Sequence, residues 1–236
     1  MSETRCIGPA SNRLLAKLSP DDFRLLEPYL TRVQLPLRMQ LARRNQPIEY
    51  AYFIERGIAS VVVNGANHRS IEVGIVGWEG LTGIAVLMGT DRSPHETYMQ
   101  VPGDGLRIAE ADLRHAMKQS PILHRSLLNY AHAFFVQTAY TALANGRGKL
   151  EERLARWLLM AHDRCDGNEL YLTHEFLGLM LGTSRPGVTT ALNQLEKDGL
   201  IRTDRAAIVV LDREGLEEAA NGTYGAAEAE LKRLFG

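Results

Sequence analysis

Cysteine is almost missing from this 236-residue chain, which holds only Cys6 and Cys165. Two cysteines so far apart in the sequence do not make a disulfide framework. They are also too few for a four-thiolate zinc site or an iron–sulfur cluster. We therefore expect two reduced thiols without a role, no metal site and no cofactor.

The chain also lacks a surplus of charge and any long apolar run. Its 27 Lys and Arg residues face 28 Asp and Glu residues, a net charge of -1, so no overall basic field points to nucleic acid. No apolar stretch approaches the roughly 18–20 residues that span a bilayer, and the first residues lack the apolar core of a signal peptide. We expect a cytoplasmic protein that has no membrane partner.

Recognisable catalytic motifs are absent from the sequence. It has no Walker loop, no dinucleotide fingerprint and no Ser-His-Asp arrangement. A metal enzyme on a small β-barrel needs clustered histidines, and only His68 and His95 lie in the segment where we expect a barrel. No motif selects any histidine as a haem ligand. We expect a protein that is not an enzyme.

The sequence pattern divides the chain into three parts. In residues 1–112, a short helical lead-in precedes short β-type runs between Val33 and Ile108, separated by Gly- and Asn-rich turns. This pattern predicts an antiparallel barrel or sandwich. Residues 113–145 hold a long helix opened by Pro121, and the two glycines of Asn145–Gly148 mark a joint. Residues 146–236 read as helices, a β-hairpin and a helical tail, so the fold class is α+β.

The long helix carries a heptad pattern. Its apolar, small or amide side chains recur in alternating steps of four and three residues, which predicts a dimer seam. The alternative is that this face packs on the chain's own barrel, because the helix could pack on two sides. The predicted dimer contacts are Leu123, Leu127, Tyr130, Phe134, Gln137 and Thr141.

A winged helix-turn-helix is predicted in the last part of the chain. Residues 173–181 and 184–198 read as helices joined by a tight turn at Gly182, and a hairpin follows. Such a unit places the N-terminal half of its second helix in the major groove of DNA. If Ser184 is the cap, Pro186 is the second helical residue, where proline costs no hydrogen bond.

The outer face of that second helix suits DNA reading. Arg185 can pair with guanine and Asn193 with adenine, whereas Thr189 and Thr190 can meet phosphate or a thymine methyl group. Four basic residues balance four acidic ones between positions 173 and 205, which leaves open a scaffold that acts only through protein contacts. Further predicted DNA contacts are Thr173, Ser184, Gly187, Arg202 and Arg205.

The stretch LTHEFLGLMLGTSRPGVTTALNQLEKDGLI, followed by AAIVVLD, resembles the winged helix-turn-helix of the Crp/Fnr family of bacterial transcription regulators. The order of parts extends the resemblance to nearly the whole chain. It implies an antiparallel β-roll of the double-stranded β-helix type, similar to a cyclic-nucleotide-binding domain, and a homodimer on an inverted-repeat operator. Double-stranded DNA and RNA polymerase are the implied partners. Of the three base-reading positions in well-known members, Arg185 matches, whereas Pro186 and Thr190 replace a glutamate and an arginine.

The resemblance also raises the question of an effector. Family members that bind cyclic AMP use a Gly-Glu pair and an arginine followed by a small hydroxyl residue. Glu79, Arg92 and Ser93 match in residue type, but Trp78 replaces the glycine and Pro94 disturbs the register. These three are the predicted effector residues of an unidentified ligand, and a cyclic-nucleotide-responsive regulator is the alternative.

Overall fold

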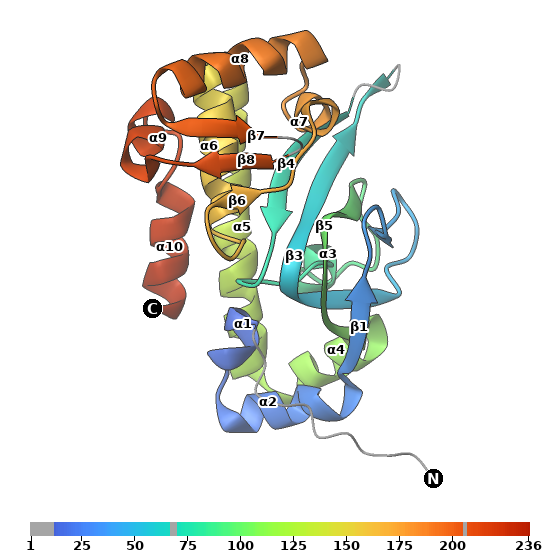
Figure 1. Ribbon diagram of the computed structural model, residues 1–236. Coiled ribbons are helices and arrows are strands. Elements are labelled where there is room, and N and C mark those ends of the chain that lie inside the picture. The colour runs from blue at the N-terminus through green and yellow to red at the C-terminus, as the bar shows by residue number, and fades with distance from the viewer. Residues whose placement is uncertain (1–11, 67–69, 205–206) are drawn as a thin grey trace.

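The computed structural model describes residues 12–66, 70–204 and 207–236 (Figure 1). A curled antiparallel sheet and a long helix form the N-terminal half, and a compact group of helices with a small sheet forms the rest. The predicted α+β class and the predicted order of parts are confirmed.

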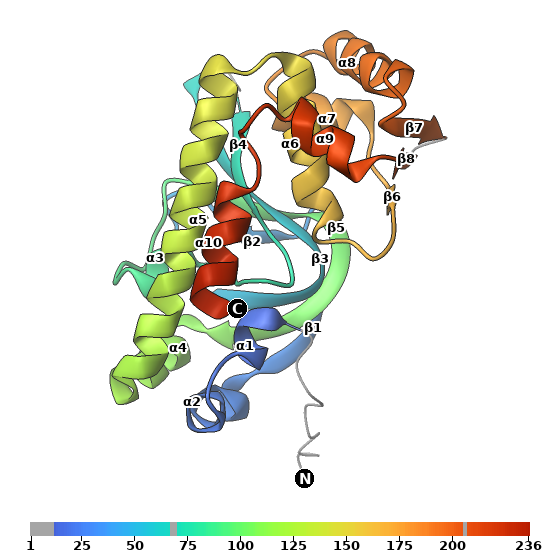
Figure 2. The same ribbon diagram turned by 90° about the vertical axis from the view of Figure 1, so that its left-hand side faces the viewer.

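The N-terminal sheet has five antiparallel strands in the order β1-β5-β3-β4, with β2 also paired to β5. The two longest strands bend where Gly57 takes a φ of +89°. A Cβ atom on the facing Gly103 would lie 1.9 Å from the carbonyl oxygen of Arg56, so the strands approach too closely there for a side chain. Figure 2 shows that β3 and β5 are strongly curved, which gives the sheet its curled shape. The strands are β1 (Thr31–Leu35), β2 (Gln40–Ala42), β3 (Tyr50–Asn64), β4 (Ser70–Val76) and β5 (Glu96–Ala109).

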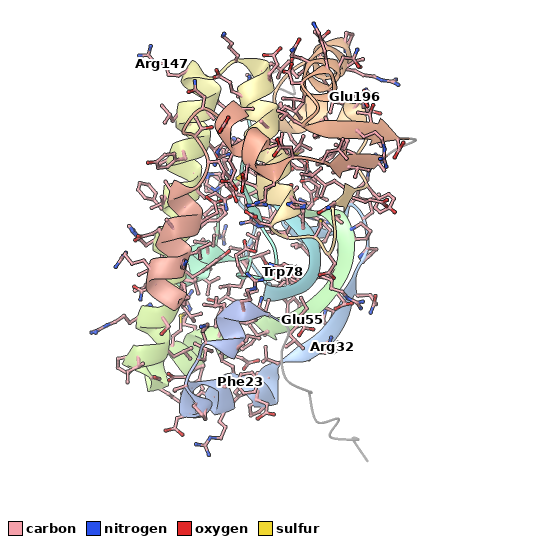
Figure 3. The ribbon with its side chains drawn as sticks, turned by 60° about the vertical axis from the view of Figure 1, so that its left-hand side comes forward. Phe23, Arg32, Glu55, Trp78, Arg147 and Glu196 are labelled. Carbon is pink, nitrogen blue, oxygen red and sulfur yellow. The ribbon has the colours of Figure 1, made fainter. Side chains whose placement is uncertain are left out.

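Short helices close the ends of this sheet. The Asn12 side chain donates to the carbonyl oxygens of Ile54 at 2.7 Å and Gly80 at 2.8 Å, which fixes the start of the lead-in. Arg32 on β1 and Glu55 on β3 form an ion pair on the sheet, and Figure 3 labels both. The helices are α1 (Arg13–Ala16), α2 (Pro20–Leu26), η1 (Glu27–Tyr29), α3 (Ile84–Leu87) and α4 (Glu110–Gln119).

The long helix α5 spans Pro121–Arg147. The Ser120 hydroxyl caps it by accepting from the Leu123 N–H at 3.1 Å. It continues into the predicted joint as far as Arg147, and the Gly148 N–H still donates to the carbonyl of Ala144 at 2.8 Å. Within the described ranges, no helix combines the length and the apolar character needed to cross a membrane.

The C-terminal half follows directly and packs on the sheet. Ile58, Val62 and Ile75 of the sheet share one apolar cluster with Trp157 and Leu181 of the helices. The small sheet has the order β6-β8-β7. The elements are α6 (Leu150–His162), β6 (Glu169–Leu170), α7 (His174–Met180), α8 (Arg185–Lys197), β7 (Ile201–Asp204), β8 (Ala207–Val210), α9 (Arg213–Ala219) and α10 (Ala226–Phe235).

The last helix returns to the middle of the molecule. Figure 2 shows α10 lying beside α5, with the C-terminus close to α1. His132 Nε2 on α5 lies 2.9 Å from Glu230 Oε1 on α10. Leu231 and Phe235 of α10 pack against the apolar cluster that includes Tyr130. Helix α5 therefore contacts elements of both halves of the chain.

Candidate nucleic-acid interface

The two helices of the helix-turn-helix are held together by an apolar core. The Thr173 hydroxyl caps α7 by accepting from the Phe176 N–H at 3.2 Å, and the Ser184 hydroxyl caps α8 by accepting from the Gly187 N–H at 3.3 Å. The turn between them needs Gly182, whose φ is +59°. The cap expected at Ser184 is confirmed, and Thr173 caps α7 in the same way. The buried core residues are Leu177, Met180, Val188, Leu192 and Leu195.

The unusual start of α8 is compatible with a regular helix. The helix begins at Arg185, so Pro186 occupies its first turn, as predicted. An N–H at that position has no partner inside a helix, and proline therefore loses nothing. A Cβ on Gly187 would lie 3.0 Å from Thr183 Oγ1, which favours glycine at this point.

The face of α8 opposite the core is polar. Arg185, Thr190 and Asn193 are exposed there. Thr189 is half-buried, and its hydroxyl donates to the Arg185 carbonyl at 3.1 Å and lies 3.0 Å from His174 Nδ1. Three of the four predicted base-facing side chains are therefore exposed, although the Thr190 hydroxyl donates to the Pro186 carbonyl at 3.1 Å. Thr189 is partly used inside the fold.

The hairpin after α8 is connected to the helix by one carboxylate. Glu196 accepts from the Thr203 N–H at 2.7 Å and from its hydroxyl, and these bonds hold the pKa of Glu196 below its usual value. Figure 3 labels Glu196 in this region. Arg202 is exposed and lies 3.1 Å from Asp204. The predicted contact Arg205 lies outside the described residues.

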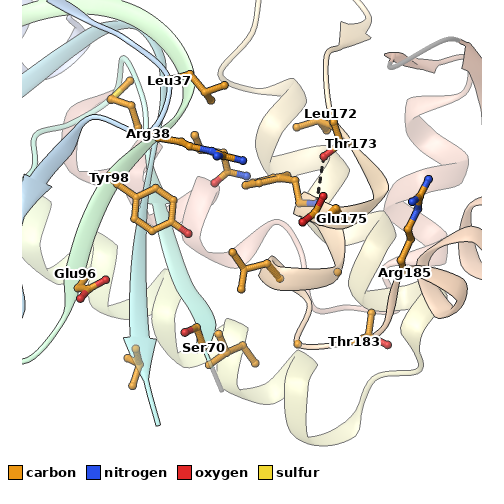
Figure 4. Close-up of a pocket in the computed structure, with 18 of the residues that line it drawn as sticks. Leu37, Arg38, Ser70, Glu96, Tyr98, Leu172, Thr173, Glu175, Thr183 and Arg185 are labelled. Carbon is orange, nitrogen blue, oxygen red and sulfur yellow. Dashed lines mark hydrogen bonds between the residues drawn. The ribbon is translucent and has the colours of Figure 1, made fainter. Parts of the chain in front are cut away.

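A cleft of about 1270 Å³ separates the helix-turn-helix from the N-terminal sheet (Figure 4). Thr183 and Arg185 line it on one side, and Arg38 and Tyr98 line it on the other. The beginning of α8 therefore faces the chain's own sheet in this conformation.

A buried carboxyl group joins the two halves behind this cleft. The indole N–H of Trp157 on α6 donates to Glu72 on β4 at 2.6 Å, and the Ser60 hydroxyl on β3 contacts the other carboxyl oxygen at 2.6 Å. Burial raises the pKa of Glu72 to about 7, although both hydrogen bonds oppose the rise. Phe176 of α7 packs edge-on against the Trp157 ring, with centroids 5.8 Å apart. Sequence reasoning did not identify this junction.

The three predicted effector residues are not brought together. Glu79 forms an ion pair at 2.8 Å with Arg164, which lies in the turn after α6. Arg92 is exposed and pairs with Asp91 at 3.6 Å, and the Ser93 hydroxyl forms its hydrogen bonds with His95 in the same turn. In the described part of the chain no hydrogen bond or ion pair joins Glu79 to Arg92 or Ser93. The three side chains are engaged in separate local contacts, and an effector site built from them stays a prediction.

The predicted dimer face of α5 packs on the chain's own sheet. Gln137 accepts from the Ile75 N–H at 2.7 Å and donates to the Ile75 carbonyl at 3.2 Å. Tyr130 fills the space beside Gly80, where an added Cβ would lie 2.1 Å from its hydroxyl oxygen. Within one copy, this packing matches the alternative that the heptad spacing left open. Of Leu123, Leu127, Tyr130, Phe134, Gln137 and Thr141, all but Phe134 are buried within one copy of the chain.

A second apolar stripe runs along the opposite face of α5. Leu128 is 39% exposed, Phe135 68% and Leu143 47%. Ala139 and Ala142 are exposed between them. Leu128 and Phe135 are one heptad apart, which is the signal that could have revealed this face from the sequence.

A curled antiparallel sheet, a long connecting helix and a winged helix-turn-helix define a two-part fold with one DNA-reading unit. Residues 152–219 match the family model described as a Crp-like helix-turn-helix domain. A search of the curated proteins finds no match.

This chain covers nearly the whole length of several solved structures that have a similar fold. FixK2 from Bradyrhizobium japonicum is 18% identical, with 80% of this chain and 96% of that chain covered and a TM-score of 0.71. The c-di-GMP responsive global regulator CLP from Xanthomonas campestris is 18% identical, covering 81% and 99%, with a TM-score of 0.65. A transcriptional regulator of the CRP family from Thermus thermophilus is 22% identical, covering 83% and 99%, with a TM-score of 0.65.

These comparisons confirm the resemblance predicted from the sequence. The chain has the fold of Crp/Fnr transcriptional regulators, and its C-terminal half contains a Crp-like helix-turn-helix domain. The similar proteins named here are described as a global regulator and a transcriptional regulator.

Proposed function

We propose that this protein is a cytoplasmic, sequence-specific DNA-binding transcription regulator that acts as a homodimer on an inverted-repeat operator. The observation that carries the proposal is the exposed polar face at the start of α8, held rigidly by the core of a Crp-like helix-turn-helix. RNA polymerase is the further partner that such a regulator addresses.

The base readers are the exposed side chains of α8. Arg185 pairs in bidentate fashion with guanine, and Asn193, about two helical turns further along α8, pairs with adenine. Thr190 and Thr189 contact a thymine methyl group or a phosphate. Thr173, Ser184, Gly187, Arg202 and Arg205 meet the phosphate backbone, where they set the register without reading sequence.

The two copies meet through the exposed stripe of α5. Leu128, Phe135 and Leu143 are large apolar side chains that a monomer would leave in water. Their helix is long, and the opposite face is already occupied by the sheet. Two parallel copies of this stripe would bury it and would place two α8 helices on successive major grooves, roughly 34 Å apart.

Selection from random duplex DNA tests the proposal. Full-length protein at low salt should enrich a palindromic sequence whose half-sites are about one helical turn apart. Enrichment with no palindrome would argue against the homodimer. Absence of any enrichment would favour the scaffold that acts through protein contacts alone.

A further inference from the structure

Gln100 on β5 is a polar group that the fold does not use. Its side chain is only 6% exposed and lines the cleft between the sheet and the helix-turn-helix. Neither Oε1 nor Nε2 has a hydrogen-bond partner among the described residues. A buried carboxamide without partners lowers stability, because the hydrogen bonds that it made to water are not replaced. A molecule that pairs with both atoms would remove this cost.

The walls of the cleft are suited to an apolar ring. Tyr98 of the sheet and Phe176 of α7 both line it. Three large apolar side chains are exposed along it, Leu37 at 57%, Tyr171 at 73% and Leu179 at 44%. Concave sites with apolar walls and a few polar groups are typical of small-molecule binding, and the volume of about 1270 Å³ is ample for one.

The charged residues of the cleft balance one another. Arg38 and Glu96 line it from the sheet, and Glu175 and Arg185 line it from the helix-turn-helix. Figure 4 shows the two pairs on opposite walls. Two positive and two negative groups produce no net field, so the cleft offers no special attraction to a phosphate or another anion.

We propose that this cleft binds a neutral, planar ligand whose ring carries a hydrogen-bond donor beside an acceptor, as the lactam edge of an oxopurine does. Gln100 recognises that edge through two parallel hydrogen bonds, because a carboxamide offers one acceptor and one donor side by side. Tyr98 and Phe176 supply the aromatic contacts to the ring.

Such a ligand would contact both halves of the molecule at once. Phe176 packs on Trp157, which is hydrogen-bonded to Glu72 of the sheet. Arg185 lines the same cleft and is the proposed guanine reader. Occupancy of the cleft therefore changes how α7 and α8 rest on the sheet. This coupling rests on the proposed function, whereas binding itself does not.

The test compares hypoxanthine with purine, which has the same rings but lacks the carbonyl group and the neighbouring N–H. Full-length protein is titrated with each compound by calorimetry. Hypoxanthine should bind at least about tenfold more tightly, the ratio expected when two buried polar atoms find partners. No binding of hypoxanthine at millimolar concentration, or equal affinity for the two compounds, would overturn the proposal.

Two variants locate the recognition. Gln100→Leu and Gln100→Glu should both lose the preference for hypoxanthine and retain the affinity for purine, since neither keeps the donor and acceptor pair. A preference that survives in a folded variant would show that Gln100 is not the recognising group. The comparison of ligands on the unaltered protein stands even if a variant does not fold. Failure of operator binding to respond to hypoxanthine would contradict only the coupling.

Discussion

Trp157 and Glu72, 85 residues apart in the sequence, are joined by a hydrogen bond of 2.6 Å between the helical half and the sheet. An indole N–H can only donate, so Glu72 Oε1 accepts in either protonation state. A protonated carboxyl group can donate from Oε2 to the Ser60 hydroxyl, which also accepts hydrogen bonds. The neutral form therefore keeps both contacts without a buried charge.

Stability should fall as pH rises through this group. The folded-state pKa of Glu72 is raised from 4.5 to about 7 by burial, so its favourable contribution is complete below about pH 4.5 and is lost as pH rises through about 7. Urea unfolding at pH 5 and at pH 7.5 measures the change. Glu72→Gln should flatten this dependence, because the amide stays neutral and keeps a donor and an acceptor. Glu218→Gln, at an exposed site, should not alter it. An unchanged slope in Glu72→Gln would contradict the assignment.

Arg185→Ala should weaken operator binding by about 1–3 kcal/mol and relax the preference at one guanine. Affinities for the selected operator and for single-base variants of it measure both effects. Lys197→Ala, at the far exposed end of α8, should preserve the preference. Equal loss of affinity on all sequences would make Arg185 a phosphate contact instead.

Phe135→Glu should produce monomers, because it places a charge in the middle of the proposed seam; we expect the dimer dissociation constant to rise at least about tenfold. Sedimentation velocity measures the state of association. Ile122→Glu is the matched control, since Ile122 is 69% exposed and Phe135 68% exposed on the same helix. Phe134→Glu should lower stability instead, because the Phe134 ring lies against Gly74 of the sheet. A Phe135→Glu protein that is still dimeric would exclude this seam.

Gly80→Ala should lower the free energy of unfolding by about 1–3 kcal/mol, because the new methyl group would collide with the buried Tyr130 ring. Gly146→Ala provides the opposite control within α5. Its Cβ would meet nothing within 4 Å, so alanine should stabilise the helix by about 0.5–1 kcal/mol. Chemical denaturation of both variants measures the difference. Equal stabilities would mean that Tyr130 moves aside at no cost.

Local chemistry made the helix-turn-helix predictable. The roles of Ser184 and Pro186 depend only on their own first turn, and the heptad spacing of α5 is a property of one helix. The heptad spacing does not reveal which surface each stripe of the helix packs against. Gln137 and Phe135 both lie on long stripes, and only the tertiary fold decides that Gln137 meets the sheet while Phe135 stays in water.

The predicted effector residues and the Trp157–Glu72 junction illustrate a different limit. Glu79 was compared with a motif, but its partner Arg164 lies in the turn after α6, 85 residues further along the chain. Gln100 carries no motif at all, and only the burial of its unpaired amide distinguishes it. Such pairings arise when distant segments meet, so no pattern within one segment reports them.

The return of α10 to α5 restricts how the DNA-binding half can move. Its first helix follows α5 at Gly148, and its last helix lies against α5 again. Arg156 reinforces both attachments by donating to the carbonyls of Gln137 at 3.2 Å and Thr223 at 2.9 Å. A rotation of the DNA-binding half about Gly148 alone would break the contact between α10 and α5. A reorientation of α8 about Gly148 therefore requires both attachments to α5 to open.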